Sequence, residues 1–195
     1  MAEVRSLQQE RRARLFRNGK PTLRPAKLLN EDGSYGEDMG VLWAAYKAGS
    51  FPLVDDQGLE PAQFGQLIVN LCAGLSDVVI AEDVSNQYAA GRGPVAFVGI
   101  RNDGWRYEPH VDFFAWATPR NVLRSTVAFL QFMRYHKDVG VCIVRSLPPH
   151  VPLFKRIEKY AVLNYVGKIF RGTPRGDEHM FSVAGKKRTG DMNGH

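Results

Sequence analysis

The 195-residue chain lacks the features that mark several large classes of protein. Two cysteines are too few for a secreted domain held together by disulfides, and no run approaches the roughly 18 apolar residues that cross a bilayer. The first residues, MAEVRSLQQERRARLF, hold no apolar signal-peptide core. A disordered chain would carry fewer apolar residues than the 44% found here. We therefore expect one soluble globular domain, intracellular or associated with a particle.

The central part of the chain carries no net charge. Residues 21–185 hold 17 basic and 17 acidic side chains, so the net charge of +6 comes from the two ends. This predicts a basic N-terminal arm over 1–20, a domain over 21–184 and a basic C-terminal tail over 185–195. Such arms are typical of segments that contact an acidic partner rather than of a basic binding face. The expected partner-binding residues are Arg5, Arg11, Arg12, Arg14, Arg17, Lys186, Lys187 and Arg188.

The order of periodic segments predicts an α/β fold of the mixed α+β kind. Helices are expected over 4–16, 37–48, 61–75 and 151–160, and another that opens at Thr118-Pro119 and ends at His136. Strands are expected over 77–84, 94–101, 105–117, 140–147, 164–171 and 179–183, and 22–29 is expected to be a strand or an extended segment. A strand, helix, strand step across the helix that opens at Thr118-Pro119 implies one central parallel pair. We expect a largely antiparallel sheet with that pair at its centre, flanked by helices, plus an N-terminal helical arm.

Two segments carry a family resemblance. His110–Asn121, with the sequence HVDFFAWATPRN, and Tyr165–Ile169, with the sequence YVGKI, follow the same order of elements as the GNAT superfamily of N-acetyltransferases. Over residues 22–183 the chain resembles that superfamily, and it is particularly similar to a divergent bacteriophage branch. The resemblance implies a GNAT-like fold and, for an enzyme, acetyl-CoA as the acyl donor.

The chain departs from the family where the family binds its cofactor. An Arg/Gln-x-x-Gly-x-Gly/Ala loop normally brings backbone N–H groups to the pyrophosphate at a helix N-terminus. The matching stretch, Arg120–Ser125, has larger residues at both glycine positions, and Pro119 removes one donor. The family's tyrosine acid aligns with Ile157, and Tyr160 lies three residues further on. The resemblance assigns cofactor contacts to Arg120, Asn121, Val122 and Arg124.

Glu108, His110 and Asp112 alternate along one expected strand and so share a face. One of them is then a candidate general base that removes a proton from an amine before acyl transfer. Alternatively, the three form the solvated face of a strand whose other side is apolar. Cys72 and Cys142 each lie in an apolar run and are expected to be buried thiols, and no spacing predicts a metal site.

Two functions are compatible with these features. The first is a phage-encoded GNAT-fold protein without catalysis or cofactor, serving as a structural or assembly component of the virion. Its arms would then dock on other virion proteins, on copies of the same chain or on nucleic acid, and it would contact no membrane. The alternative is an acetyl-CoA-dependent N-acetyltransferase with an unconventional cofactor loop. The expected location is the virion or the host cytoplasm.

Overall fold

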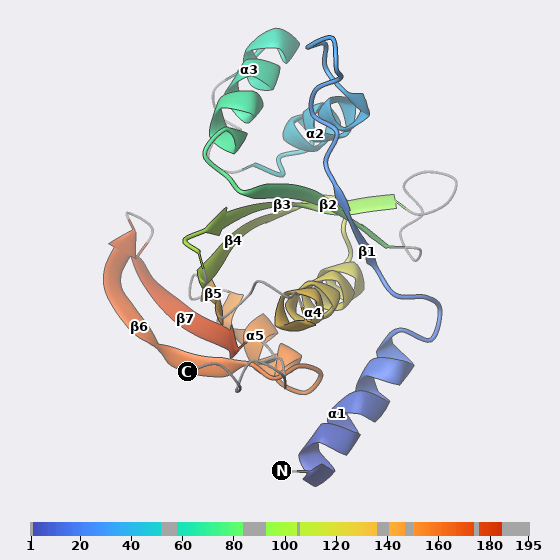
Figure 1. Cartoon of the computed structure of the whole chain (residues 1–195), viewed down its shortest axis with the longest axis vertical. Helices are drawn as coiled ribbons and strands as arrows, with labels where there is room; N and C mark the ends of the chain where they lie inside the picture. The colour runs from blue at the N-terminus through green and yellow to red at the C-terminus, as the bar shows by residue number, and fades with distance from the viewer. Residues whose placement is uncertain are drawn as a thin grey trace, which may run out of the picture. The chain divides into compact units, whose positions relative to one another are not determined.

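The helices and strands of the chain, seen here in a computed structural model, follow the expected order (Figure 1). The structure describes residues 2–51, 58–83, 93–104, 106–135, 141–146, 150–173 and 176–184. Its helices are α1 (Ala2–Leu15), α2 (Glu37–Lys47), α3 (Pro61–Cys72), α4 (Pro119–Tyr135) and α5 (Val151–Ile157). Its strands are β1 (Thr22–Pro25), β2 (Asp77–Asp83), β3 (Gly93–Asn102), β4 (Arg106–Phe113), β5 (Val141–Ser146), β6 (Asn164–Thr173) and β7 (Gly176–Ala184).

The strands form one seven-stranded sheet in the order β1-β2-β3-β4-β5-β7-β6. The pairs β1–β2, β2–β3, β5–β7 and β6–β7 are antiparallel, whereas β4 and β5 run parallel with Tyr107 opposite Cys142. This confirms the mixed fold class with a central parallel pair. Within the described residues, no helix is long and apolar enough to span a membrane.

Contacts between residues divide the chain into two compact units. The first unit comprises Met1–Leu15, Asn102–Pro109 and Thr126–His195, and the second comprises Phe16–Arg101 and His110–Ser125. The boundaries between the two units therefore fall inside β4, inside α4 and inside residues 1–20, the stretch that the charge pattern predicts to be one arm.

The core of the second unit lies between α2, α3 and one face of β2 and β3 (Figure 1). Leu42, Phe64 and Ile80 are completely buried there. The ring of Tyr46 stacks on Phe64 with 4.9 Å between centroids and on Trp43 with 5.3 Å. Because α2 and α3 present these rings to β-branched strand residues, burial of apolar area holds the helices on the sheet.

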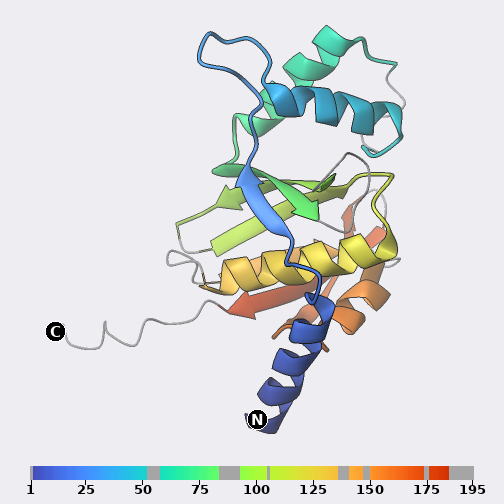
Figure 2. The same ribbon diagram turned by 90° about the vertical axis from the view of Figure 1, so that its right-hand side faces the viewer.

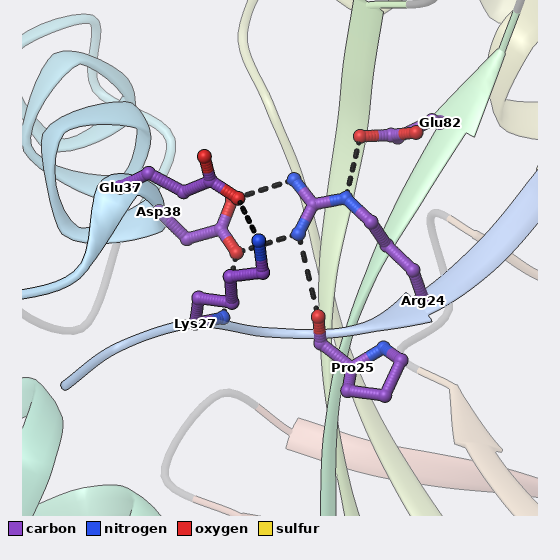
Figure 3. A network of polar contacts seen from close by, with 6 residues as sticks. All are labelled: Arg24, Pro25, Lys27, Glu37, Asp38 and Glu82. Carbon is purple, nitrogen blue, oxygen red and sulfur yellow. Dashed lines mark hydrogen bonds and ion pairs between the residues drawn. The ribbon is translucent and has the colours of Figure 1, made fainter. Parts of the chain in front are cut away.

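Arg24 of β1 connects three elements of the second unit (Figure 3). Its guanidinium donates to both carboxylate oxygens of Asp38 in α2, at 2.6 and 2.7 Å, and to Glu82 of β2 at 2.7 Å. Burial alone would raise the pKa of Asp38, but hydrogen bonds from Arg24 and from the N–H of Lys27 outweigh it and lower this pKa. The resulting stabilisation exists above the unfolded-state pKa of Asp38 and is lost as the pH falls through its folded-state pKa.

Gly36, the residue before α2, lies directly against the chain that leads to it. Its N–H donates to the carbonyl of Leu28 at 2.9 Å, and a Cβ at this position would collide with the carbonyl oxygen of Lys27. That oxygen cannot move freely, because it accepts a hydrogen bond from the N–H of Asp38. We expect Gly36→Ala to lower the free energy of unfolding by about 1–3 kcal/mol, measured by urea denaturation.

Gly40→Ala is the matched control for that prediction. Gly40 is exposed on α2, and a Cβ there would meet nothing within 4 Å. Alanine is more favourable than glycine inside a helix. The free energy of unfolding of this variant is therefore expected to rise by up to about 1 kcal/mol. Equal effects at the two positions would show that Gly36 is not constrained by the backbone of Lys27.

The first unit joins β5, β6, β7 and α5 with the N-terminal helix. Phe154 of α5 stacks on Phe181 of β7 with ring centroids 4.6 Å apart, and Ile157 is completely buried. The thin apolar face of α1 predicts that this helix needs a partner, and the structure supplies one in the same unit (Figure 2). Gln8 and Arg12 of α1 donate to the carbonyls of Glu158 and Tyr160, at 2.9 and 2.8 Å.

The predicted boundaries of four strands are wrong. The strand expected to reach Ala117 ends at Phe113, because the chain then turns and the N–H of Ala117 donates to the carbonyl of Phe114. The strand expected over 22–29 ends at Pro25, whose ring cannot donate to a ladder. The final hairpin turns between Thr173 and Gly176, so β6 and β7 are both longer than the alternation indicates.

Candidate active site

The polar face of β4 is the first part of the candidate site. On the opposite face, Val111 and Phe113 pack against the cluster formed by Ala81, Val95 and Ala96. The alternation therefore places His110 and Asp112 on the face that this cluster leaves free, as the period of two predicts. Of the three candidate bases, these two lie in the second unit and Glu108 lies in the first.

His110 and Asp112 form a carboxylate–imidazole pair. His110 Nε2 lies 3.3 Å from Asp112 Oδ2, and the imidazole is 66% exposed whereas the carboxylate is 21% exposed. The hydrogen bond to Asp112 raises the pKa of His110, and its effect exceeds the opposite effect of burial. Since Nε2 points to the carboxylate, Nδ1 is the nitrogen left to accept a proton. The pair has the geometry of a base held by a carboxylate.

Glu108 has a different environment. Its Oε1 lies 2.6 Å from Nε of Arg145 on β5, and Arg145 also lies 3.8 Å from a carboxylate oxygen of Glu178 on β7. Glu108 is thus the counter-ion of an arginine that sequence reasoning overlooked. The only sequence signal was a single charge inside the apolar strand VCIVRS. The structure brings together only two of the three predicted bases.

The start of α4 is the second part of the candidate site. Thr118 donates through its N–H and its hydroxyl to Oδ1 of Asn121, at 3.0 and 2.7 Å, and the N–H of Asn121 donates back to the Thr118 hydroxyl at 3.2 Å. Pro119 occupies the first helical position. The predicted helix start is confirmed, and Asn121 uses its side chain and its N–H to cap the helix.

Arg120 is the residue of this first turn that faces solvent with a positive charge. The turn contains no acidic residue, so no side chain of the turn itself offsets the positive end of the helix dipole. Val122 is half-buried, and its N–H already donates to the carbonyl of Thr118. Where the GNAT family has an open glycine loop, this chain is already helical, with Leu123 and Ser125 buried.

Arg124, expected beside a cofactor, is completely buried instead. Its Nε and Nη2 donate to the two carboxylate oxygens of Asp83, at 2.8 and 3.1 Å, and Nη2 also donates to the carbonyl of Gly19. The ring of Phe16 lies 5.7 Å from the guanidinium carbon. Arg124 is therefore an internal ion-pair partner, and its assignment to a surface phosphate is corrected.

The residues expected in partner-binding arms have mixed environments. Arg11, Arg14 and Arg17 are exposed, whereas Arg12 is half-buried against Tyr160. The expected contacts of these arginines with other molecules remain predictions. The remaining members of the set lie outside the described residues, namely the Arg5 side chain, Lys186, Lys187 and Arg188.

Thiol and metal chemistry have little basis in the described part of the chain. Cys142 is buried and Cys72 half-buried, and burial raises the pKa of these thiols to about 12 and about 11. Both are therefore protonated and weakly nucleophilic near neutral pH. Among the described residues, no group of three His, Cys, Asp or Glu side chains could hold a metal ion.

Comparison with solved structures identifies the fold. The chain is similar to a chimera of the spermidine N-acetyltransferase of Vibrio cholerae, with a TM-score of 0.60 and 9% identity over 85% of this chain and 96% of that one. An aminoglycoside acetyltransferase solved with coenzyme A and kanamycin has a TM-score of 0.56 and 13% identity over 85% and 95%. A GNAT-family acetyltransferase of Bacillus anthracis has a TM-score of 0.56 and 11% identity over the same shares.

The chain therefore has the GNAT fold, as the resemblance in its sequence implies. No protein-family model and no curated protein sequence matches it. At these identities the likeness shows the fold alone, because one fold hosts many activities. What the protein does has to be argued from its own residues.

Proposed function

We propose that the protein is an acetyl-CoA-dependent N-acetyltransferase acting on a small amine. The observation that carries this proposal is the His110–Asp112 pair on β4. In a fold whose solved relatives transfer acetyl groups to spermidine and aminoglycosides, it provides a base for an ammonium substrate. An amine attacks an acyl group only after losing a proton, and an imidazole is suited to accepting that proton near neutral pH.

In the proposed reaction, Nδ1 of His110 takes a proton from the substrate ammonium while Asp112 holds the imidazole through Nε2. The freed amine nitrogen would bond to the acetyl carbon as the carbon–sulfur bond breaks, and the second proton that the nitrogen loses on becoming an amide would pass to the leaving thiolate, giving coenzyme A thiol. Acetyl-CoA supplies the activated thioester. Asp112 stabilises the imidazolium that forms at His110, because an adjacent carboxylate favours the charged ring.

The start of α4 fits an anion through charge rather than through an amide loop. Arg120 offers an exposed guanidinium at the positive end of the helix. Pro119 has no N–H, and the N–H of Asn121 is taken by Thr118, so few amides remain for a phosphate. We therefore assign the phosphate contact to Arg120 and expect an acetyl-CoA affinity at the weak end of the usual micromolar-to-millimolar range of enzyme substrates.

Titration calorimetry with acetyl-CoA tests the proposal. The full chain is expected to bind with a Kd of about 100 µM, and Arg120→Glu is expected to weaken binding at least tenfold, or about 1.4 kcal/mol. Arg101→Glu is the control, because Arg101 is also exposed but lies on β3. Spermidine and kanamycin are then tested as acceptors by following release of coenzyme A thiol.

The second candidate function is a non-catalytic GNAT-fold component of a particle. The capped start of α4 favours it, because Asn121 satisfies the helix with the chain's own atoms. Absence of any acetyl-CoA binding at about 1 mM would exclude the enzyme and leave this second function. A role in a virion is tested separately by mass spectrometry of purified particles.

A further inference from the structure

Two segments of the first unit that are distant in the sequence are joined by hydrogen bonds. Gln8 and Arg12 of α1 donate to the carbonyls of Glu158 and Tyr160, so α1 lies against the C-terminal end of α5 (Figure 2). Residues 6–15 and 151–161 hold six basic and two acidic side chains, a net charge of +4. We call this the α1–α5 surface. Its basic residues are Arg11, Arg12, Arg14, Lys155, Arg156 and Lys159.

These basic side chains lack ionic partners among the residues that the structure describes. Five of the six are exposed, and none of the six forms an ion pair with any residue that the structure describes. In contrast, Arg24, Arg106 and Arg145 on the strands all pair with carboxylates. Like charges gathered without counter-ions repel one another, and an external polyanion would relieve that repulsion.

We propose that the α1–α5 surface binds the phosphate backbone of duplex DNA without reading its sequence. Duplex DNA carries one negative charge per ~1.7 Å of helix axis, a charge density that favours binding to a cationic surface. The 14 residues of α1 span ~21 Å, enough to lie along several phosphates. The arginines add a planar fork suited to phosphate oxygens. This inference is independent of the proposed enzymatic function.

An anionic membrane is a less suitable partner for the same surface. A helix that lies in a membrane interface needs a broad apolar face opposite its basic one. The exposed side of α1 offers Leu7 as its one large apolar side chain among the described residues, between Ser6, Gln9 and Glu10. Charge is thus present without the apolar area that would anchor it in lipid.

Fluorescence anisotropy with a labelled 25-base-pair duplex of mixed sequence tests the proposal. The full chain is expected to bind, and its affinity to fall steeply between 50 and 200 mM salt. The triple variant Arg11→Gln, Arg14→Gln, Lys159→Gln spares Arg12, which holds α1 in place. It is expected to bind at least tenfold more weakly and to reduce the slope of log K against log salt by about 2.7.

The control removes the same charge from exposed positions of the second unit: Lys27→Gln, Lys47→Gln and Arg101→Gln. It is expected to change DNA affinity less than threefold. Equal losses in both triple variants would overturn the proposal, because net charge alone would then explain binding. So would an unchanged affinity in the α1–α5 variant, or binding of phosphatidylserine vesicles but not of DNA. Circular dichroism checks that both variants retain their helices.

Discussion

Asp83→Asn is expected to lower the free energy of unfolding by about 3–5 kcal/mol, measured by urea denaturation. Asp83 and Arg124 are both completely buried, and two guanidinium nitrogens donate to the two carboxylate oxygens. The amide that replaces the carboxylate keeps its size but not its charge. It would remove the carboxylate charge that faces the buried Arg124 guanidinium at two nitrogens, and this accounts for the large cost.

A double variant distinguishes two contributions to the free energy of unfolding: the penalty for burying one charge without its counter-ion, and the stabilisation that the ion pair itself provides. Asp83→Leu combined with Arg124→Met removes both charges and is expected to recover most of the stability that Asp83→Asn loses. Asp103→Asn serves as the surface control, because Asp103 pairs with Arg106 in solvent and should cost under about 1 kcal/mol. A loss below about 1 kcal/mol for Asp83→Asn would mean that the interior solvates Arg124 by other means.

His110→Gln is expected to lower kcat/KM for acetyl transfer about 10²–10⁴-fold, the range for loss of a general base. Acetyl-CoA affinity is expected to remain within about twofold, because the phosphate contact is assigned to Arg120 on α4. Glu108→Gln is the matched control, since Glu108 is a second predicted base that instead binds Arg145. It should change kcat/KM less than tenfold. The reverse pattern would make Glu108 the base.

The pH profile of kcat/KM distinguishes a base from a structural residue, because a purely structural role of His110 would not place a limb of that profile at its pKa. A base must be neutral to accept a proton, so activity rises as the pH passes upward through the pKa of His110. The carboxylate of Asp112 raises that pKa. Asp112→Asn removes the raising interaction, so the acidic limb of the kcat/KM profile is expected to shift to lower pH while the activity maximum falls. A limb that stays in place would show that another group controls it.

Local patterns predicted most of the fold. The period of two on β4 correctly grouped His110 with Asp112, and Thr118 with Pro119 correctly marked the start of α4. Both signals depend on residues within one turn or one strand of each other, where backbone geometry decides the outcome. Strand ends were predicted less well, because residues beyond a strand bond to groups distant in the sequence: just after β4, the N–H of Ala115 donates to the hydroxyl of Ser50.

The partners of charged side chains could not be predicted in this way. Arg124 was assigned to a cofactor from its place in a motif, yet it binds Asp83, 41 residues earlier. Glu108 was grouped with its strand neighbours, yet it binds Arg145 on another strand. A side chain takes the counter-ion that folding brings near it, and a carboxylate in the right position satisfies a guanidinium whatever its distance along the chain.

By itself, the sequence determined the order of helices and strands, the GNAT-like fold class, the capped start of α4 and the lack of net charge between residues 21 and 185. Only the tertiary structure decided which charges are internal and which are left for partners. It buried Arg124 on Asp83 and joined Arg12 of α1 to the carbonyl of Tyr160, beyond the end of α5. The physical reason is that charge is a property of each residue, whereas burial and pairing depend on which distant segments pack together.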